Sequence, residues 1–331
     1  MFKEIISLDN LFLAWDEFKK GKRKKKDVQE FEYNLENNIF ELHHELKIKI
    51  YSHSDYTSFN ICDPKPRKIH KACVGDRVLH HAIFRILYPI FDKSFIFDSY
   101  SCRNAKGTHK AVSRLQMFAR KTSKNRTKTC FILKCDIKKF FNSIDQDILT
   151  FLIKKKIKDT NAVWLIEKII KSFSTLSDKG LPLGNITSQL FANIYLNELD
   201  YFIKQNLRIK HYIRYCDDFV ILTSDREHLE SIISVISEFL KEKLKLSLHK
   251  GKVIIKKHHQ GIDFLGYVDL PYHRILRTKT KKRMLEKIKL KSLDFDKGKI
   301  SKDLFNQTLQ SYFGVLKHCN GHELKQKISR L

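Results

Sequence analysis

The stretch His211–Thr223, HYIRYCDDFVILT, constrains the chain more than any other, because two apolar runs flank two adjacent carboxylates. Apolar, β-prone runs around a short polar step predict a β-hairpin, with Asp217 and Asp218 at its tip. Adjacent acids beside apolar strands are costly unless a positive group compensates them. A divalent metal ion is a suitable partner, because hard cations bind carboxylate oxygens. The alternative is a plain polar turn, in which Asp is also common.

A second stretch, Thr129–Phe141 (TCFILKCDIKKFF), favours the metal site over the plain turn. Its apolar run Cys130–Cys135 ends in Asp136, which predicts a buried strand with a carboxylate at its C-terminal end. One carboxylate from a strand and two from a hairpin can hold two metal ions, which clamp the attacking and leaving oxygens of a phosphoryl transfer. We therefore predict that Asp136, Asp217 and Asp218 form one site.

The charge of the chain predicts a polyanionic partner. Among 331 residues, 64 Lys and Arg against 37 Asp and Glu leave a net charge of +27, which suits nucleic acid or an anionic membrane. No apolar run of about 18 residues is present to span a membrane, and the N-terminus lacks a signal-peptide pattern. The 7 cysteines contain no CxxC pair and are typical of reduced thiols, which argues against a zinc site or a disulfide framework.

Local patterns predict several helices, and the length allows two or three packed subdomains. Apolar residues at helical spacing predict one long helix over 27–46. Ser143 with Gln146 fits a capping box for a helix over 144–156. Another helix is expected from Asn185 onward, after a loop that contains Gly180 and Gly184.

Two motifs carry a family resemblance. Tyr215-Cys216-Asp217-Asp218 resembles the YxDD box of reverse transcriptases, and Asp136 with Phe140-Phe141 resembles their first palm motif. The resemblance covers roughly Ile50 to the C-terminus. It implies an α+β right-hand polymerase fold, with an antiparallel palm sheet backed by helices. The implied divisions are an N-terminal helical extension (1–50), fingers (51–128), palm with fingers contributions (129–270) and a helical thumb (271–331).

The resemblance implies RNA-directed DNA synthesis with two Mg²⁺ ions, for which Mn²⁺ can substitute. Asp136, Ile137, Asp217 and Asp218 would form the metal site, where one ion lowers the pKa of the primer 3′-hydroxyl and the other holds the triphosphate. Ser247–Ile255 resembles the fourth palm motif, whose lysine protonates the departing pyrophosphate. Lys250 is the predicted general acid and Lys252 the alternative, and both also suit ordinary surface positions.

The resemblance also implies a site for deoxynucleoside triphosphates. Basic residues of the fingers would hold the phosphates. Phe141, which otherwise suits the core, would exclude a 2′-hydroxyl. The segment Gly180–Asp200 resembles the second palm motif, where glycine lets backbone approach the nucleotide. The predicted nucleotide-binding residues are Arg67, Lys68, Arg77, Phe141, Leu183, Gly184 and Gln189.

Template RNA and the RNA–DNA hybrid are the implied polymer partners. Gly261–Tyr267 resembles the primer grip, which presents backbone to the primer end, and a basic helical thumb suits the shape and phosphates of a hybrid. A basic loop near residue 103 would meet template phosphates. The predicted nucleic-acid-binding residues are Arg103, Lys106, Phe264, Gly266, Lys281, Lys282 and Arg283.

The segment around Leu183 indicates a branch of the family. Leu183 stands where most members carry Gln, and Ser188-Gln189 where they carry Ser-Pro. This pattern resembles the reverse transcriptases of diversity-generating retroelements. The likeness implies that a template-repeat RNA is copied with errors at adenines to diversify a target gene. It also implies a basic helical accessory protein and the cytoplasm of a bacterial, archaeal or phage-encoded host cell, with no membrane partner.

Three alternatives stay open. A retron reverse transcriptase is of the same class, although Asn104-Ala105 is followed by His109, one residue late for its NAxxH box, and its VTG triplet is missing. An antiphage relative would make DNA without a template. A non-catalytic, RNA-binding maturase-like protein is of another class, and the intact carboxylates argue against it.

Overall fold

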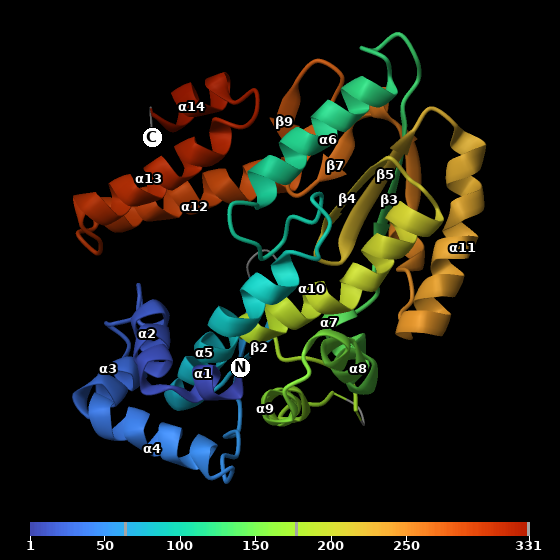
Figure 1. Ribbon diagram of the computed structural model, residues 1–331. Coiled ribbons are helices and arrows are strands. Elements are labelled where there is room, and N and C mark those ends of the chain that lie inside the picture. Colours follow the sequence, from blue (N-terminus) through green and yellow to red (C-terminus); the bar gives the residue numbers. More distant parts are fainter. Residues whose placement is uncertain (63–64, 176–177, 330–331) are drawn as a thin grey trace.

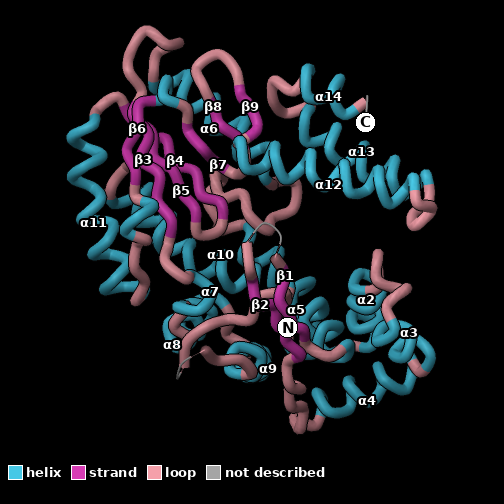
Figure 2. The backbone as a smooth tube through the Cα atoms, turned by 180° about the vertical axis from the view of Figure 1, so that it is seen from behind, coloured by secondary structure: helices cyan, strands magenta, loops and turns pink. Residues whose placement is uncertain are grey.

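The structure is a computed structural model that describes residues 1–62, 65–175 and 178–329. At its centre lies an antiparallel sheet with the strand order β4-β5-β3-β6, seen from behind in Figure 2. Its strands are β3 (Phe131–Asp136), β4 (His211–Tyr215), β5 (Asp218–Thr223) and β6 (Ile254–Lys257). The predicted hairpin is therefore present as β4–β5, and the predicted strand that ends in a carboxylate is β3.

One face of this sheet belongs to the main hydrophobic core. Successive side chains of a strand point to opposite faces, which turns Leu133 of β3 and Phe219 of β5 into this core, where both are fully buried. Helices α10 (Ile186–Tyr201) and α11 (Arg226–Leu244) contribute to the same core. Figure 1 shows α11 along the outer side of the sheet.

The opposite face packs against a second core. Ile132 of β3 and Val220 of β5 point to this side, where helix α6 (Thr108–Thr122) covers the sheet. A small antiparallel sheet adjoins it, made of β7 (Ile262–Phe264), β8 (Tyr267–Asp269) and β9 (Arg274–Leu276). The alternation that buries Ile132 and Val220 places Asp136 and Asp218 on this face as well, at one end of the sheet.

The N-terminal part is helical and packs on helix α5 (Val74–Asp92) (Figure 1). The single helix expected over 27–46 is divided at Asn34, whose backbone leaves the helical region at φ −120°, ψ 41°. Trp15 and Phe18 of α2 are buried against this layer. The helices are α1 (Phe2–Ile6), α2 (Leu8–Phe18), α3 (Lys26–Tyr33) and α4 (Leu35–Lys47).

A two-stranded hairpin, β1 (Thr57–Ile61) and β2 (Arg67–Lys71), precedes α5. The helix expected over 144–156 begins later, because Asp145 rather than Ser143 is its cap and accepts a hydrogen bond from the Ile148 backbone N–H at 3.0 Å. The remaining helices of this region are α7 (Phe140–Ser143), α8 (Gln146–Lys156) and α9 (Thr160–Lys171). Short turns of π-helix or 3₁₀-helix lie at Phe202–Asn206, Lys250–Lys252 and His258–Gln260.

Three helices end the chain: α12 (Thr278–Asp296), α13 (Lys302–Leu316) and α14 (His322–Ile328). They extend to one side of the sheets in Figure 1. The final two positions of the expected thumb, 330–331, lie outside the described residues. Across the described part of the chain, no helix combines the length and apolar character that a membrane crossing requires.

Candidate active site

The strand register brings the predicted carboxylates together. Asp136, the last residue of β3, pairs directly with Asp218, the first residue of β5. Asp217 lies in the tight turn before it, and its carbonyl accepts a hydrogen bond from the Ile137 backbone N–H at 3.2 Å. Ile137 itself is buried, so it reaches this site only through its backbone. Two strand ends and one turn thus place three acids side by side.

The turn that carries Asp217 has an unusual backbone. Cys216 adopts a left-handed conformation at φ 56°, which non-glycine residues rarely take. Burial raises the pKa of the Cys216 thiol, so the thiol stays protonated at neutral pH. A left-handed residue next to a reactive site persists only where neighbouring groups hold it.

Arg214 of β4 holds this turn in place. Its guanidinium binds the Asp200 carboxylate through Nε at 2.7 Å and Nη2 at 2.6 Å, and both side chains are fully buried. Its Nη1 donates to the Cys216 carbonyl at 3.2 Å and to Asn193 Oδ1 at 3.2 Å. Asn193 in turn donates to the Ser101 carbonyl at 2.9 Å. Helix α10 thereby fixes the hairpin tip.

Two of the three carboxylates, Asp217 and Asp218, have surroundings that disfavour their charged forms. Burial raises the pKa of Asp217. Burial together with the charges of Asp217 and Asp136 raises the pKa of Asp218 to about 6, although Lys134 opposes the shift. The near cation at Asp136 is Lys252, whose Nζ lies 2.7 Å from Asp136 Oδ1. Grouped carboxylates whose charged forms are disfavoured in this way are stabilised by added cations.

The donor set fits a divalent metal ion. Carboxylate oxygens are the ligands that hard cations prefer, and Asp136, Asp217 and Asp218 supply them from one end of the sheet. Among the described residues, no group of three Asp, Glu, His or Cys side chains is already placed to hold one metal ion. The ammonium of Lys252 faces an Asp136 oxygen that a metal ion would also use.

Of the two candidate lysines, Lys252 lies at the carboxylates. Both belong to the 3₁₀ turn Lys250–Lys252, but Lys250 is exposed and Lys252 points to Asp136. This turn lies at the carboxylate end of β3, where the His249 backbone N–H donates to the Asp136 carbonyl at 2.8 Å. The sequence left the two open, and the geometry favours Lys252.

A cavity of about 620 Å³ opens beside the acids. Five of the seven predicted nucleotide-binding residues line it together with Asp217 and Asp218. They are Arg67, Phe141, Leu183, Gly184 and Gln189. Further lining comes from Ser101, Cys102, Asn185, Ser188 and Leu265.

The loop before α10 touches strand β2 closely. The His70 backbone N–H donates to the Leu183 carbonyl at 2.9 Å. Gly184 has φ +122°, and a Cβ there would come within 2.9 Å of Ile69 Cγ2. Glycine is therefore required at position 184 by both the backbone and the space.

The adjacent phenylalanines have different surroundings. Phe140 is buried in the main core and Phe141 is half-buried, and both line the cavity beside the acids. Their rings meet edge to face, with centroids 5.4 Å apart. The ring of Phe141 is thus held from behind by the core.

Two predicted phosphate ligands lie elsewhere. Lys68 alternates with Arg67 along β2 and projects from the other face of that hairpin. Arg77 binds the Asp27 carboxylate at 2.5 Å and lies over the Phe18 ring at 4.8 Å. Arg77 lines a neighbouring cavity of about 410 Å³, which shares Gly184 and Gln189 with the first. Its charge is engaged by the N-terminal helices.

Several predicted nucleic-acid contacts have internal partners instead. Arg103 is nearly buried and binds Asp92 at 2.6 Å and the Ile96 carbonyl at 2.7 Å. Lys106 donates to the Phe97 carbonyl at 2.7 Å and lies over its ring. These contacts differ from the expectation of template binding, because Arg103 is held by the end of α5 and its own loop, and Lys106 by its own loop.

The remaining predicted contacts fall on two elements. Phe264 is buried in the second core, so only its backbone faces the β7–β8 turn. Gly266 in that turn has φ +90°, and the neighbouring Leu265 reaches the cavity. Exposed cations stand on α12, among them Lys281, Lys282 and Arg283.

Asn185 is a residue that sequence reasoning missed. It is 3% exposed, and neither amide atom has a hydrogen-bond partner among residues 1–62, 65–175 and 178–329. It lines both cavities next to Gly184. A buried amide without hydrogen-bond partners lowers stability. The presence of one here therefore indicates a role in the cavity and not in packing. Its position directly after the glycine loop was the available signal.

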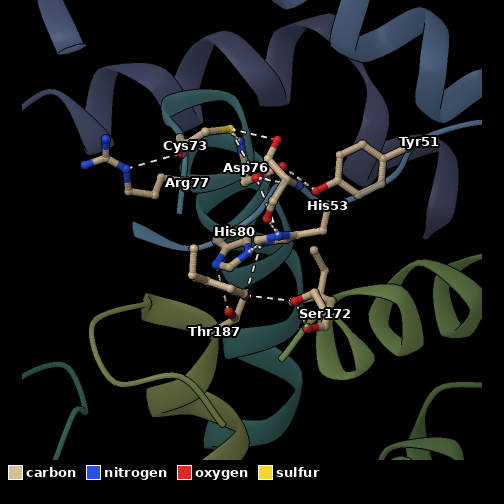
Figure 3. A network of polar contacts seen from close by, with 11 residues as sticks. Tyr51, His53, Cys73, Asp76, Arg77, His80, Ser172 and Thr187 are labelled. Carbon is tan, nitrogen blue, oxygen red and sulfur yellow. Dashed lines mark hydrogen bonds and ion pairs between the residues drawn. The ribbon is translucent and has the colours of Figure 1, made fainter. Parts of the chain in front are cut away.

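A buried polar chain ties α5 to the start of α10 (Figure 3). Tyr51 Oη donates to Asp76 Oδ1 at 2.7 Å, and the same carboxylate lies 3.5 Å from His53 Nδ1. His53 Nε2 meets His80 Nε2 at 3.2 Å, and His80 Nδ1 meets Thr187 Oγ1 at 3.1 Å. Burial lowers the pKa of His80 to about 3, so this imidazole is neutral. This series of polar contacts fixes Thr187, the residue just before Ser188, which lines the cavity.

Residues 63–269 match the family model described as reverse transcriptase (RNA-dependent DNA polymerase). Protein YkfC of Escherichia coli is 24% identical and aligns over 66% of this chain and 65% of its own length. The group II intron-encoded protein LtrA of Lactococcus lactis is 28% identical over 66% of this chain and 46% of its own. The chain thus spans about half to two thirds of these curated relatives.

A further relative and two solved structures agree. The retron Ec73 reverse transcriptase of Escherichia coli is 25% identical over 78% of this chain and 84% of its own. Telomerase from Candida albicans, solved with a telomeric RNA fragment, superposes with a TM-score of 0.54 at 12% identity, over 82% of this chain and 56% of that one. Apo telomerase from Candida tropicalis gives 0.52 at 13% identity, over 70% and 50%. The expected right-hand polymerase fold is confirmed, and the chain belongs to the reverse transcriptase (RNA-dependent DNA polymerase) family.

Proposed function

We propose that this protein is an RNA-directed DNA polymerase whose active site is the carboxylate end of the central sheet. The observation that carries this proposal is the pairing of Asp136 with Asp218 beside Asp217, at the edge of a 620 Å³ cavity. Three carboxylates next to a nucleotide-sized space are what a two-metal phosphoryl transfer requires. The divalent ions proposed are two Mg²⁺, with Mn²⁺ as a substitute.

Each group around the cavity has a role in this proposal. Asp136, Asp217 and Asp218, with the backbone of Ile137, would hold the ions. The chemistry that the ions would supply there is activation of the primer hydroxyl and neutralisation of the triphosphate. The guanidinium of Arg67 binds triphosphate oxygens from the β2 side. Further roles fall to Phe141, which would exclude a 2′-hydroxyl, and to Lys252, which would give a proton to the departing pyrophosphate.

Template RNA, the RNA–DNA hybrid and deoxynucleoside triphosphates are the proposed partners. The +27 charge supports a polyanion, and the cations of α12 stand beside the Leu265–Gly266 turn that reaches the cavity. A Cβ added at Gly266 would lie 3.6 Å from Thr280 Oγ1 of α12. The start of this helix is therefore in contact with the turn. The bacterial relatives favour a cytoplasmic setting in a bacterial, archaeal or phage-encoded host.

Within the family, we place the chain among the enzymes of diversity-generating retroelements. Leu183 and Gln189 both line the cavity, so the two departures from the common motif lie where a nucleotide would bind. The proposal includes cDNA with errors at adenines and a basic helical accessory protein. The similarity to the retron Ec73 enzyme supports a retron as the second candidate, and an antiphage enzyme is a third.

Extension of a DNA primer on an RNA template, with purified protein and Mg²⁺, tests the activity. Incorporation that depends on both template and metal is expected. Incorporation without a template would favour the antiphage alternative, and RNA binding without incorporation would favour the maturase-like one. Sequencing of the cDNA then tests the branch, since errors concentrated at template adenines are expected for a retroelement enzyme. A uniform error spectrum would contradict that assignment.

A further inference from the structure

The end of the central sheet opposite the carboxylates carries a second basic surface. Strand β3 runs from Phe131 to Asp136, so its first residue lies about 17 Å from the last at ~3.4 Å per step. The loop 123–130 precedes this strand, and the turn between β8 and β9 lies beside it in both Figure 1 and Figure 2. This surface is therefore distinct from the polymerase cavity.

The loop has a fixed shape. Lys124, Asn125 and Arg126 adopt three consecutive left-handed conformations, at φ 47°, 57° and 76°. Hydrogen bonds hold them: the Asn125 backbone N–H donates to the Arg120 carbonyl at 2.9 Å, and the Arg126 backbone N–H donates to Ser123 Oγ at 2.9 Å. Arg120 Nε also donates to Asn125 Oδ1 at 2.8 Å. The loop thus presents its cations in defined positions.

An arginine and a tyrosine form an exposed stacked pair at its edge. Arg126 Nε donates to the Pro271 carbonyl at 2.7 Å, and its guanidinium lies 4.3 Å from the centre of the Tyr272 ring. Tyr272 is nevertheless 77% exposed. A rigid aromatic ring that remains in solvent beside a guanidinium is the kind of surface on which nucleic-acid bases stack.

A polar cavity of about 330 Å³ adjoins the pair. Its size is within the range of small-ligand pockets. Donors and acceptors line it from α6, from the loop and from the turn after β6. They are Ser113, Gln116, Arg120, Ser123, Arg126 and His258. A base or a sugar placed here would find several hydrogen-bond partners.

The loop beside the pair carries charge of one sign. Between residues 119 and 130 the chain has no Asp or Glu, and it carries five cations: Arg120, Lys121, Lys124, Arg126 and Lys128. Lys257 of β6 pairs with Phe131 in the sheet register, which adds another cation at this end. A cluster of cations on one edge is typical of a surface that binds a phosphate backbone.

We propose that Tyr272, Arg126 and the loop 123–128 form a second binding site for single-stranded RNA, outside the polymerase cavity. Bases would stack on Tyr272, and phosphates would lie against Lys124 and Lys128. A membrane would need an apolar surface to insert, and an acidic peptide would gain little from the stacked ring and polar cavity. The assignment of RNA as the ligand rests on the proposed polymerase function. The binding site itself rests on the loop, the Arg126–Tyr272 pair and the polar cavity described above. The site would hold part of a long RNA while another part is copied.

The test uses full-length protein whose cavity is first filled by a chain-terminated primer on an RNA template with the next deoxynucleotide. A short, labelled, uridine-rich RNA is then added, and its binding is followed by fluorescence anisotropy. Binding to the filled protein is expected, and Tyr272→Ala should weaken it about tenfold. Lys124→Gln and Lys128→Gln should each reduce the slope of log affinity against log salt by about 0.7. Tyr33→Ala, which removes another exposed tyrosine, is the matched control and should change nothing.

Photo-crosslinking from a reactive uridine gives a second measurement, and crosslinks within residues 120–130 or 271–273 are expected. Primer extension by the same variants should stay at the wild-type rate, which separates this site from the polymerase function. No RNA binding to the filled protein, or equal binding by Tyr272→Ala, would overturn the proposal. Equal affinity for DNA of the same sequence would overturn the assignment to RNA. Binding of anionic vesicles in place of RNA would assign the surface to a membrane instead.

Discussion

Arg214 and Asp200 form a bidentate ion pair in which both side chains are completely buried, with contacts of 2.7 and 2.6 Å. The pair joins strand β4 to helix α10 directly behind the Cys216–Asp217 turn. Burial of both ions is costly, and the paired geometry offsets that cost only while both partners are present.

Replacement of one partner should therefore destabilise the fold strongly. Arg214→Met is expected to lower the free energy of unfolding by about 3–5 kcal/mol, because it leaves the Asp200 carboxylate buried without its partner. Arg226→Met is the matched control, since Arg226 pairs with Glu230 on an exposed helix face and should cost less than about 1 kcal/mol. Denaturant titration measures both. Equal losses for the two variants would show that the buried pair does not anchor the hairpin.

Asp217→Asn should abolish nucleotide incorporation and leave RNA affinity nearly unchanged. The substitution removes a charge that is proposed to bind metal at the hairpin tip, and it keeps the basic surfaces. Asp147→Asn, at an exposed position on α8, should retain activity. Incorporation and RNA binding are measured on the same preparations. Near wild-type incorporation by the Asp217 variant would remove that residue from the metal site.

Phe141→Ala should admit ribonucleotides. The ring lines the cavity and packs edge to face on Phe140, so its removal opens the volume proposed to exclude a 2′-hydroxyl. The ratio of ribonucleotide to deoxynucleotide incorporation efficiency is expected to rise about tenfold or more, the usual scale for one small group in a pocket. Phe151→Ala, on an exposed face, is the control. An unchanged ratio in a folded variant would give Phe141 a packing role only.

Lys252→Gln should slow turnover about a hundredfold or more, as expected for loss of a general acid. Lys250→Gln should have little effect, because Lys250 is exposed and it is Lys252 that pairs with Asp136. Single-turnover rates at saturating nucleotide compare the two. A larger loss from the Lys250 variant would reverse the assignment.

Leu183→Gln should lower misincorporation opposite template adenine. Leu offers neither donor nor acceptor, so a correct base pair gains no hydrogen bond from this position. One hydrogen bond of about 1 kcal/mol corresponds to roughly fivefold in selectivity. Sequencing of cDNA from the variant and the wild type provides the comparison. The same adenine error rate in both would mean that Leu183 does not set fidelity.

The hairpin and strand β3 were predictable because apolar runs with acids at their ends have few other structures open to them. The register that pairs Asp136 with Asp218 then follows from the sheet. The support behind it was not predictable, because Arg214 in HYIRY looks like an ordinary exposed strand residue. Its partner Asp200 comes from a different element, and only the tertiary fold brings the two together.

Tertiary partners also explain where individual residues depart from expectation. Arg77 and Arg103 carry charges that suit phosphates, but Asp27 and Asp92 bind them in the folded chain. The cap of α8 is Asp145 rather than Ser143, because a capping side chain is selected by the local backbone as much as by spacing. Sequence patterns identify the chemistry of a side chain and leave its nearest neighbours open.

The contact between His70 and Leu183 is made by backbone atoms alone. Any amino acid except proline at position 70, and any amino acid at position 183, can keep that hydrogen bond. The backbone around the pocket therefore does not depend on which side chain stands at position 183. Position 184, in contrast, requires glycine. Under the proposed role of Leu183 in fidelity, position 183 is a place where selection or engineering can change copying accuracy with little loss of architecture, and a saturation library there should yield mostly folded proteins.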